Sequence, residues 1–251
     1  MARPDQELRE RGGIAVPAEA ILGINKPIGW SSFDVVRMVK KRHPHDKVGH
    51  AGTLDPFAEG LLLVCIGRAT KEIAALMAYE KEYHARMRLG IATDTLDIAG
   101  RITRQCKVQL PGADEIAEIM QSFVGVIEQT PPRFSALRHE GRRFYEMARA
   151  GQEEQPQARS VYIHSITLQC ITASAIDFST VCSKGTYIRT LAQDIAARLG
   201  TVAFLSHLRR TRIGPFDIAD AIAVTTLREF SIAQPHHAVN DSCKLSGTST
   251  H

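Results

Sequence analysis

The chain has 251 residues, of which 44% are hydrophobic, 23% charged and 6% aromatic, the composition of an ordinary soluble globular protein. These values exclude the disordered, collagen-like and disulfide-scaffold classes, and at roughly 150 residues per domain the length allows one large domain or two small ones. Lys and Arg outnumber Asp and Glu by 31 to 27, so positive charge becomes informative about a partner only where it is clustered.

Both ends of the chain differ from its middle. Residues 1–20 carry seven charged side chains without periodicity, which predicts a flexible N-terminal arm, and residues 231–251 hold too few apolar side chains to build a core. We therefore expect one folded domain over residues 21–230. Its longest apolar run, residues 61–66, is far shorter than the roughly 20 residues that cross a bilayer, so we expect a cytoplasmic protein that makes no membrane contact. Five cysteines without a Cys-x-x-Cys pair predict reduced thiols rather than disulfides or a zinc site.

Within the domain, hydrophobic periodicity switches repeatedly between the strand and the helix pattern. The predicted elements in chain order are a strand at 21–24, a helix from Ser31 or Ser32 to about Arg42, a strand at 61–66, a helix at 70–79, a strand at 83–91, a helix at 113–123, strands at 161–171 and 175–182, and a helix at 188–199. In the first helix, Phe33, Val36 and Val39 are expected on the buried face. Strands in hairpin-like succession with inserted helices predict an α+β fold, a mixed and largely antiparallel sheet flanked by helices.

A glycine-punctuated loop, Gly49-His50-Ala51-Gly52-Thr53-Leu54-Asp55-Pro56, leads into the strand at 61–66. Its glycines permit backbone conformations that other residues avoid, and Pro56 favours an extended Asp55. This arrangement holds a carboxylate at the mouth of a rigid sheet, which suits a catalytic group. Asp-Pro is also a common way to start a turn, and His50 taken alone fits a structural or surface histidine equally well.

Positive charge is clustered in three segments, Arg37–His50, Arg133–Arg149 and Arg198–Arg212. The second contains five arginines interleaved with Phe134, Phe144 and other rings. Cations that pair with phosphates, mixed with flat rings that stack on bases, are typical of RNA-binding surfaces. Solvated helix faces would give the same composition. A Thr-Pro-Pro start and an internal glycine further predict that residues of about 128–152 form an irregular excursion from the sheet.

Two further segments carry charged side chains near the expected core. Thr93-Asp94-Thr95-Leu96-Asp97 offers two carboxylates, which we interpret as turn-capping groups because no histidine or further acid stands at metal-ligand spacing. Arg189 stands between Ile188 and Leu191 of the buried helical stripe. A cation so close to the core requires a carboxylate partner.

Taken in order, these segments resemble the bacterial TruB family of tRNA pseudouridine(55) synthases. The resemblance rests on Gly23–Pro27, Gly49–Pro56, Lys81-Glu82-Tyr83, Leu89-Gly90 with Thr93-Asp94-Thr95, Pro131–Tyr145, Ser183–Arg189 and Leu208-Arg209-Arg210, and it covers about residues 21–216. It implies the pseudouridine-synthase-like fold with a central RNA-binding cleft. It also implies an isomerase that flips the uridine at position 55 of the TΨC loop and remakes its glycosidic bond.

The resemblance assigns roles to individual residues. Asp55 falls on the family's nucleophile, Arg189 on the arginine that pairs with it, and Tyr83 on the tyrosine that stacks on the base and can help to transfer the C5 proton. His50 matches the residue that accommodates the flipped nucleotide. The other substrate-binding residues that we expect are Lys26, Tyr187, Leu208, Arg133, Arg142 and Arg209. Because isomerisation adds and removes no atoms, no cofactor or metal is expected, and the expected partner is tRNA alone, bound by a monomer that needs no protein partner.

The chain departs from the family pattern at two places. Glu59 stands where relatives often carry threonine, and only about 35 residues follow Phe216, so the C-terminal RNA-binding domain is expected to be absent or vestigial. Three alternative functions are a non-catalytic tRNA-binding or tRNA-folding protein, which would tolerate loss of Asp55, a guide-RNA-dependent relative, and a glycoside hydrolase. The last needs a second acid across the cleft, for which Asp94, Asp97 and Asp194 are available.

Overall fold

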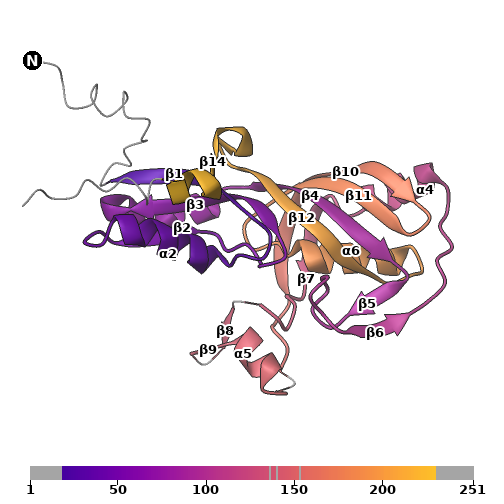
Figure 1. The fold of residues 1–251 in the computed structure, drawn as a ribbon. Coiled ribbons are helices and arrows are strands. Elements are labelled where there is room, and N and C mark those ends of the chain that lie inside the picture. The colour runs from indigo at the N-terminus through magenta and orange to yellow at the C-terminus, as the bar shows by residue number, and fades with distance from the viewer. Residues whose placement is uncertain (1–18, 136, 140, 153, 230–251) are drawn as a thin grey trace, which may run out of the picture.

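A computed structural model describes residues 19–229 of the chain, except residues 136, 140 and 153 (Figure 1). The arm expected at 1–20, apart from its last two residues, and the tail expected at 231–251 lie outside the described residues. None of the helices in the described part of the chain is long and apolar enough to cross a membrane.

Ten strands of the described chain form one sheet that runs through the whole molecule (Figure 1). They are β1 (Ala20–Lys26), β2 (Val48–Ala51), β3 (Glu59–Ile66), β4 (Lys81–Leu89), β7 (Gly125–Gln129), β10 (Arg159–Thr172), β11 (Ala175–Cys182), β12 (Ala203–Ile213), β13 (Phe216–Asp217) and β14 (Ile222–Ala223). The order across the sheet is β14-β1-β3-β12-β4-β11-β10-β7, with β2 paired to β3 and β13 to β12. Neighbouring strands are antiparallel except at β1/β14 and β3/β12, so the predicted mixed, largely antiparallel sheet is confirmed.

Two small hairpins and several helices complete the fold. The hairpins pair β5 (Ile91–Thr93) with β6 (Ile102–Gln105) and β8 (Arg138–His139) with β9 (Arg142–Arg143). The helical elements are α2 (Ser32–Arg42), η1 (Gly67–Glu72), α3 (Ile73–Ala78), α4 (Ala113–Gln121), α5 (Phe144–Arg149), α6 (Ile188–Arg198), η2 (Ile218–Asp220) and α7 (Val224–Glu229). The elements β8, β9 and α5 project from one side of the molecule, and we call them and the segments that join them to the sheet the excursion (Figure 1).

The start of α2 follows from its sequence. Ser31 is the N-cap, and it forms a capping box with Asp34 in which each side chain bonds the other residue's backbone N–H. The predicted buried face is wrong for Phe33, whose side chain is 63% exposed. At 100° per residue, Phe33 lies roughly 110° from the centre of the buried stripe formed by Ser32, Val35, Val36 and Val39, so it is beyond the edge of that stripe.

The strand β3 is apolar at nearly every position because helical elements pack on both of its faces. Leu62, Val64 and Ile66 pack in a cluster with α2 and α7, whereas Leu61, Leu63 and Cys65 pack in a second cluster with η1 and α3. A strand that is buried on both faces needs apolar residues at every position, which is the pattern at 61–66. A third and larger core lies between α6, α4 and the strands β4, β10, β11 and β12.

The parallel contact between β3 and β12 lies near the middle of the sheet and joins its two halves. Its register is short, with Glu59 beside Arg209 and Gly60 beside Arg210. Gly60 has φ +109°, and a Cβ at this position would lie 2.3 Å from the backbone oxygen of Arg210. Only glycine permits this close approach, and the loop that carries Asp55 ends at this junction.

Candidate active site

A cavity of about 800 Å³ opens beside the β3/β12 junction. Its walls come from the loop after β2, from β4 and β12, from the start of β10 and from the turn that precedes α6. Asp55, Tyr83, Leu208 and Arg189 all line it. Four residues that are far apart in the sequence therefore meet in one cleft, and we call this cavity the cleft below.

The loop that carries Asp55 is fixed on both sides by hydrogen bonds. The buried hydroxyl of Ser32 accepts from the backbone N–H of Leu54 at 2.8 Å and lies 3.2 Å from the oxygen of the same residue, to which it donates. On the other side, the N–H of Gly29 donates to the oxygen of Pro56 at 2.7 Å. The Asp55 side chain nevertheless stays 35% exposed, so a carboxylate on a rigid loop remains accessible to a ligand.

The Arg189 guanidinium forms an ion pair with the Asp55 carboxylate in the cleft. Its Nε lies 2.9 Å from Oδ2 of Asp55, and only 3% of the side chain is exposed. Its Nη1 donates to the backbone oxygen of Thr95 at 2.8 Å, and its Nη2 donates to the backbone oxygen of Phe134 at 3.0 Å. Arg189 therefore joins the Asp55 loop, the 93–97 turn and the base of the excursion, and it directs Asp55 with a charge-assisted contact.

Asp97 is a second carboxylate in contact with Arg189, at 3.5 Å from Nη1. Its own Oδ1 accepts from the Thr95 hydroxyl at 2.7 Å and from the Ala99 N–H at 3.0 Å, which is a turn-capping role. Burial raises the pKa of this carboxyl, and Thr95 and Arg189 oppose the rise. The turn role agrees with the sequence interpretation of this segment, whereas the ion pair could not be inferred from local spacing.

Tyr83 presents its ring on the same face of the sheet as Leu208 and Arg210. In the register between β4 and β12, Tyr83 lies opposite Arg210. Leu208 precedes Arg210 by two residues on β12 and therefore lies on the same face. The Tyr83 side chain is buried to 8% exposure, and this burial raises the pKa of its hydroxyl, opposed by the Arg210 guanidinium beside it. The phenol therefore keeps its proton at neutral pH and offers a flat, neutral ring to a ligand.

Arg210 is a site residue that the sequence reasoning missed. It is 1% exposed, and its Nε donates to the oxygen of Leu61 at 2.8 Å while Nη2 donates to the oxygen of Gly52 at 3.0 Å. It thus ties the start of the Asp55 loop to β3 and places a positive charge behind the cleft. The alternation of side chains along a strand could have identified it, because Leu208 was expected in the cleft and Arg210 follows two positions later.

Further cations line the cleft. Lys81 donates to the oxygens of Met77 and Tyr79, and burial together with the nearby Arg210 lowers the pKa of its ammonium to about 8. Arg159 lies over the ring of Tyr187, 5.1 Å from the ring centroid. The backbone of Tyr187 is held by the side chain of Gln129. The amide oxygen of Gln129 accepts from the backbone N–H of Tyr187 at 2.8 Å, and its amide nitrogen donates to the backbone oxygen of Tyr187 at 3.1 Å. The cleft therefore combines a carboxylate, two aromatic rings and a positive lining.

Several residues expected at the site do not line the cleft. Lys26 is fully buried, and its ammonium donates to the oxygens of Pro27 and Trp30, so it supports the turn that contacts the Asp55 loop. Burial lowers its pKa to about 8, although Asp55 opposes this. His50 lies on β2, where burial and then Arg210 lower the pKa of its imidazole, and its Nδ1 has no hydrogen-bond partner among the described residues.

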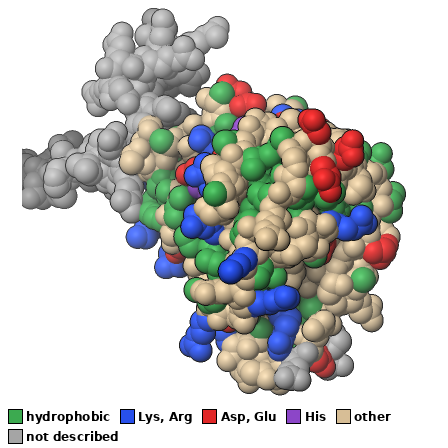
Figure 2. Space-filling view, turned by 90° about the vertical axis from the view of Figure 1, so that its right-hand side faces the viewer, with side chains coloured by type: hydrophobic (Ala, Val, Ile, Leu, Met, Phe, Trp, Pro, Cys, Tyr) green, Lys and Arg blue, Asp and Glu red, His purple; other side chains and the backbone are tan. Residues whose placement is uncertain are grey.

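The three arginines expected to grip RNA lie in different places. Arg209 lies on the sheet face opposite the cleft, because it alternates with Leu208 and Arg210, and its Nε is 4.0 Å from Glu59. Arg133 donates to the oxygen of Gln152 and so closes the base of the excursion, on which Arg142 is exposed. Figure 2 shows Lys and Arg side chains gathered toward the lower part of its view, where the excursion lies, and acidic side chains toward the upper edge.

The chain is similar to known proteins along most of its length. Residues 38–188 match the model of the TruB family pseudouridylate synthase N-terminal domain, and residues 189–243 match the model of the tRNA pseudouridylate synthase B C-terminal domain. The tRNA pseudouridine synthase B of Bordetella avium is 44% identical over 84% of this chain and 88% of its own length. That of Clostridium kluyveri is 46% identical over 83% of this chain and 72% of its own.

Solved structures show the same similarity. In a Cbf5-Nop10-Gar1 complex, one chain superimposes with a TM-score of 0.63 and is 31% identical, over 83% of this chain and 53% of that one. In an H/ACA RNP bound to a substrate RNA containing 2'-deoxyuridine, the TM-score is 0.62 at 28% identity, over 89% and 54%. This chain spans about half the length of both.

Proposed function

Because this chain belongs to the TruB family of pseudouridylate synthases, we propose that it isomerises the uridine at position 55 in the TΨC loop of tRNA to pseudouridine, in the cleft that holds Asp55. The protein is a tRNA pseudouridine synthase, and therefore an isomerase. The observation that carries the assignment of the site is the 2.9 Å ion pair between Asp55 and Arg189, with the carboxylate still partly exposed in the cleft.

The reaction breaks the bond between C1' of the ribose and N1 of uracil, turns the base, and forms a bond from C1' to C5. The proton on C5 leaves and N1 gains one, so atoms balance without a cofactor. A carboxylate serves this sequence either as the nucleophile at the sugar or the base, or as the group that takes up a proton from the sugar. Each of these routes uses the negatively charged carboxylate of Asp55, which the Arg189 guanidinium contacts at 2.9 Å.

The substrate base must leave its folded loop before Asp55 can reach it. Flipping a nucleotide costs a few kcal/mol, which stacking and phosphate contacts offset. In the cleft, the Tyr83 ring and the apolar Leu208 side chain offer the surface for the base, and Lys81, Arg159 and Arg210 supply the positive potential for the RNA backbone. The excursion with Arg133 and Arg142 extends this potential beyond the cleft. His50, a neutral imidazole on β2 just before the Asp55 loop, is our candidate for a contact with the flipped nucleotide.

The proposal also includes the conditions in which the enzyme works. It acts in the cytoplasm as a monomer, on tRNA alone, without a protein partner, a metal or a cofactor. The folded catalytic domain covers residues 21–230, with the RNA-gripping insertion at about 128–152. These expectations follow from the chemistry of the isomerisation and from the family.

The direct test is to incubate the purified chain with an unmodified tRNA transcript and to map pseudouridine by carbodiimide labelling and primer extension. A single new stop at position 55 is expected. A transcript with cytidine at position 55 serves as the control and should give no stop. Pseudouridine at another position, or none at all, would contradict the assignment.

Tyr83 allows a prediction that separates its ring from its hydroxyl. The neutral phenol described above favours a stacking role, so Tyr83→Leu should weaken tRNA binding roughly 5- to 10-fold, the loss of about 1 kcal/mol or more expected for one stacked base. Tyr83→Phe keeps the ring and should retain the wild-type affinity while it loses part of the turnover rate, because the contact of the hydroxyl with Arg210 is gone. Filter binding and single-turnover assays measure both effects, and equal affinities of the two variants would show that the ring does not hold the base.

A further inference from the structure

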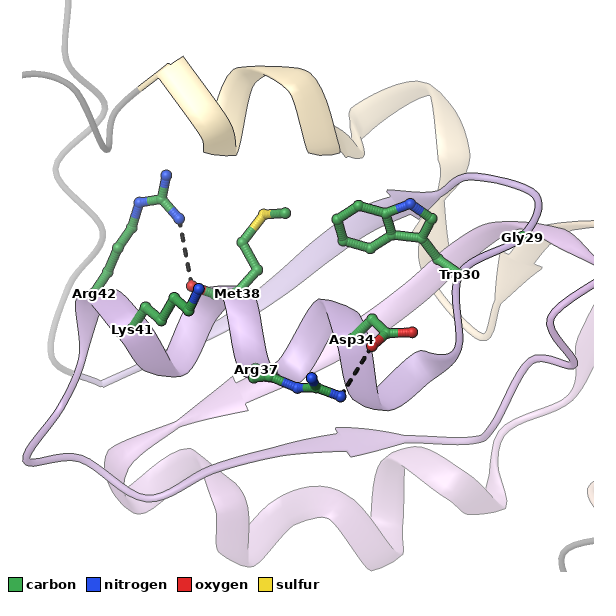
Figure 3. A pocket seen from close by; sticks show the side chains of 7 residues that line it. All are labelled: Gly29, Trp30, Asp34, Arg37, Met38, Lys41 and Arg42. Atoms are coloured by element: carbon green, nitrogen blue, oxygen red, sulfur yellow. Dashed lines mark hydrogen bonds and ion pairs between the residues drawn. The ribbon is translucent and has the colours of Figure 1, made fainter.

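A second cavity, of about 470 Å³, lies outside the cleft along α2, where Trp30, Met38 and Arg42 point toward α7 (Figure 3). Trp30 and Met38 form its apolar part and pack against the cluster that contains residues of α7. Arg37, Lys41 and Arg42 form its polar part. We call it the α2 pocket. It combines an indole ring with cationic side chains, and nothing in the reaction proposed above uses it.

The α2 pocket carries an excess of positive charge. Its acidic side chain, Asp34, is already occupied: it accepts from the N–H and the hydroxyl of Ser31, and it pairs with Arg37 at 3.1 Å. This leaves Lys41 and Arg42 without an acidic partner in the described part of the chain. No acidic side chain among the described residues therefore neutralises the charge at the far end of the pocket.

Arg42 is the cation at this end with the fewest hydrogen-bond partners for its buried nitrogens. Its Nη1 makes a long contact of 3.4 Å with the oxygen of Met38, whereas Nε and Nη2 are buried and have no hydrogen-bond partner among residues 19–229 as described. Burial also lowers the pKa of this guanidinium. Leaving charged donors buried and unpaired is costly, and a bound anion would satisfy both nitrogens at once.

A backbone hydrogen bond connects the near end of the pocket to the loop that carries Asp55. Gly29, at its near end, donates to the oxygen of Pro56, the residue that follows Asp55. From the first residue of α2 to Arg42 the helix rises about 15 Å, at roughly 1.5 Å per residue. An RNA strand that runs out of the cleft over the 29–30 turn covers this distance within a handful of phosphates.

We propose that the α2 pocket binds one nucleotide of the substrate RNA outside the cleft, with a backbone phosphate on Arg42 and Lys41 and the base against the ring of Trp30. This inference rests on the proposed function, because it takes the tRNA as its ligand. An aromatic ring beside cations without an acidic partner fits a nucleotide, which has both a phosphate and a flat base. A free anion would not contact the indole, and an acidic peptide has no flat group to stack on it.

Trp30 makes the proposal directly measurable, because it is the only tryptophan of the 251 residues. Titration of the full chain with an unmodified tRNA transcript should quench the intrinsic tryptophan fluorescence as the base stacks on the indole. Free N-acetyltryptophanamide, titrated in parallel, corrects for light absorbed by the RNA. If filter binding detects the complex while the corrected fluorescence stays constant, the proposal is overturned, and an acidic peptide becomes the better candidate for the pocket.

The cationic end is tested with Lys41→Gln, Arg42→Gln and the double variant. We expect the double variant to bind tRNA at least 10-fold more weakly. The slope of log Kd against log salt concentration should fall by the equivalent of about one to two phosphate contacts. The single-turnover rate at saturating RNA should stay unchanged. Arg104→Gln, which removes an exposed cation from β6, is the matched control and should change none of these. If Arg42→Gln fails to fold, the exposed Lys41 and the ring change Trp30→Leu carry the test. Wild-type affinity in these variants, or an equal loss in the control, would overturn the proposal.

The failure of this proposal can be distinguished from the failure of the proposed function. Pseudouridine formation by the wild-type chain decides whether the enzyme acts on tRNA. The ratio of tRNA affinities between the pocket variants and the wild type decides whether the α2 pocket contributes. A chain that forms pseudouridine with unaltered affinity in all the pocket variants would keep its function and lose the pocket.

Discussion

Replacing Asp55 with asparagine is expected to abolish pseudouridine formation while tRNA affinity stays within about twofold of the wild type. The change preserves the shape of the side chain but removes the negative oxygen that the chemistry needs, so we expect the single-turnover rate to fall by a factor on the order of 10⁴ or more. Binding should persist because the stacking and phosphate contacts in the cleft do not involve this oxygen. Pseudouridine mapping and filter binding on the same preparations measure the two effects.

A neighbouring aspartate offers a matched control for this experiment. Asp94→Asn changes an exposed side chain of the 93–97 turn, whose Oδ1 accepts from the N–H of Arg101 at 2.8 Å, and asparagine keeps that acceptor. This variant should retain full activity. Substantial product from Asp55→Asn would refute the assignment of the catalytic carboxylate and would favour a protein that binds and folds tRNA without modifying it.

The second large effect is expected for Arg189→Met, which should lower both activity and stability. The guanidinium contacts Asp55, Asp97 and two backbone oxygens, so its loss frees the Asp55 carboxylate and leaves Asp97 buried without its ion pair. Breaking a buried pair in this way costs about 3–5 kcal/mol, which for a chain of this size lowers the melting temperature by roughly 10 °C. We expect the rate to fall on the order of 10³-fold or more, since Asp55 loses both its direction and its counter-charge.

The loss of stability should depend on pH with a definite sign. Without Arg189, the buried Asp97 has a folded-state pKa that is raised still further above its unfolded value, so the folded variant takes up a proton where the unfolded chain does not. The deficit of the variant relative to the wild type should therefore shrink as the pH falls toward about 4. Thermal unfolding between pH 7 and pH 5 measures this trend. Arg101→Met, which removes an exposed side chain outside the cleft, is the control and should leave both rate and stability unchanged.

Local patterns predicted several elements of this fold but missed β12, a strand near the middle of the sheet. The serine before α2, the continuous apolar run of β3 and the alternation in β11 each correspond to an element of the structure. Their physical basis is local, because a cap, a doubly buried strand and a half-buried strand each require a particular residue pattern. Phe33 shows the limit of this approach: a helical period of three places it near the buried stripe, but only contacts with the rest of the protein decide how wide that stripe is.

The site was predictable only in part. Asp55, Tyr83 and Arg189 were expected from family resemblance, and the structure places them in one cleft, although their catalytic roles stay predictions. Arg210 was within reach of strand alternation, whereas Arg209 was selected from the same basic run and lies on the other face. The contact between Asp97 and Arg189 joins residues 92 positions apart, and no local pattern encodes such a pairing.

The position of Arg189 has a consequence for when the enzyme becomes active during its synthesis. The segments that its guanidinium joins are separated by up to 134 residues along the chain, from Asp55 to Arg189. Contacts of such high sequence separation form late, because the entropy of closing the long loops must be overcome before the contact contributes. A nascent chain that has emerged only as far as the first strands holds an undirected carboxylate, so catalytic competence arises with the last long-range contacts rather than with the first folded elements.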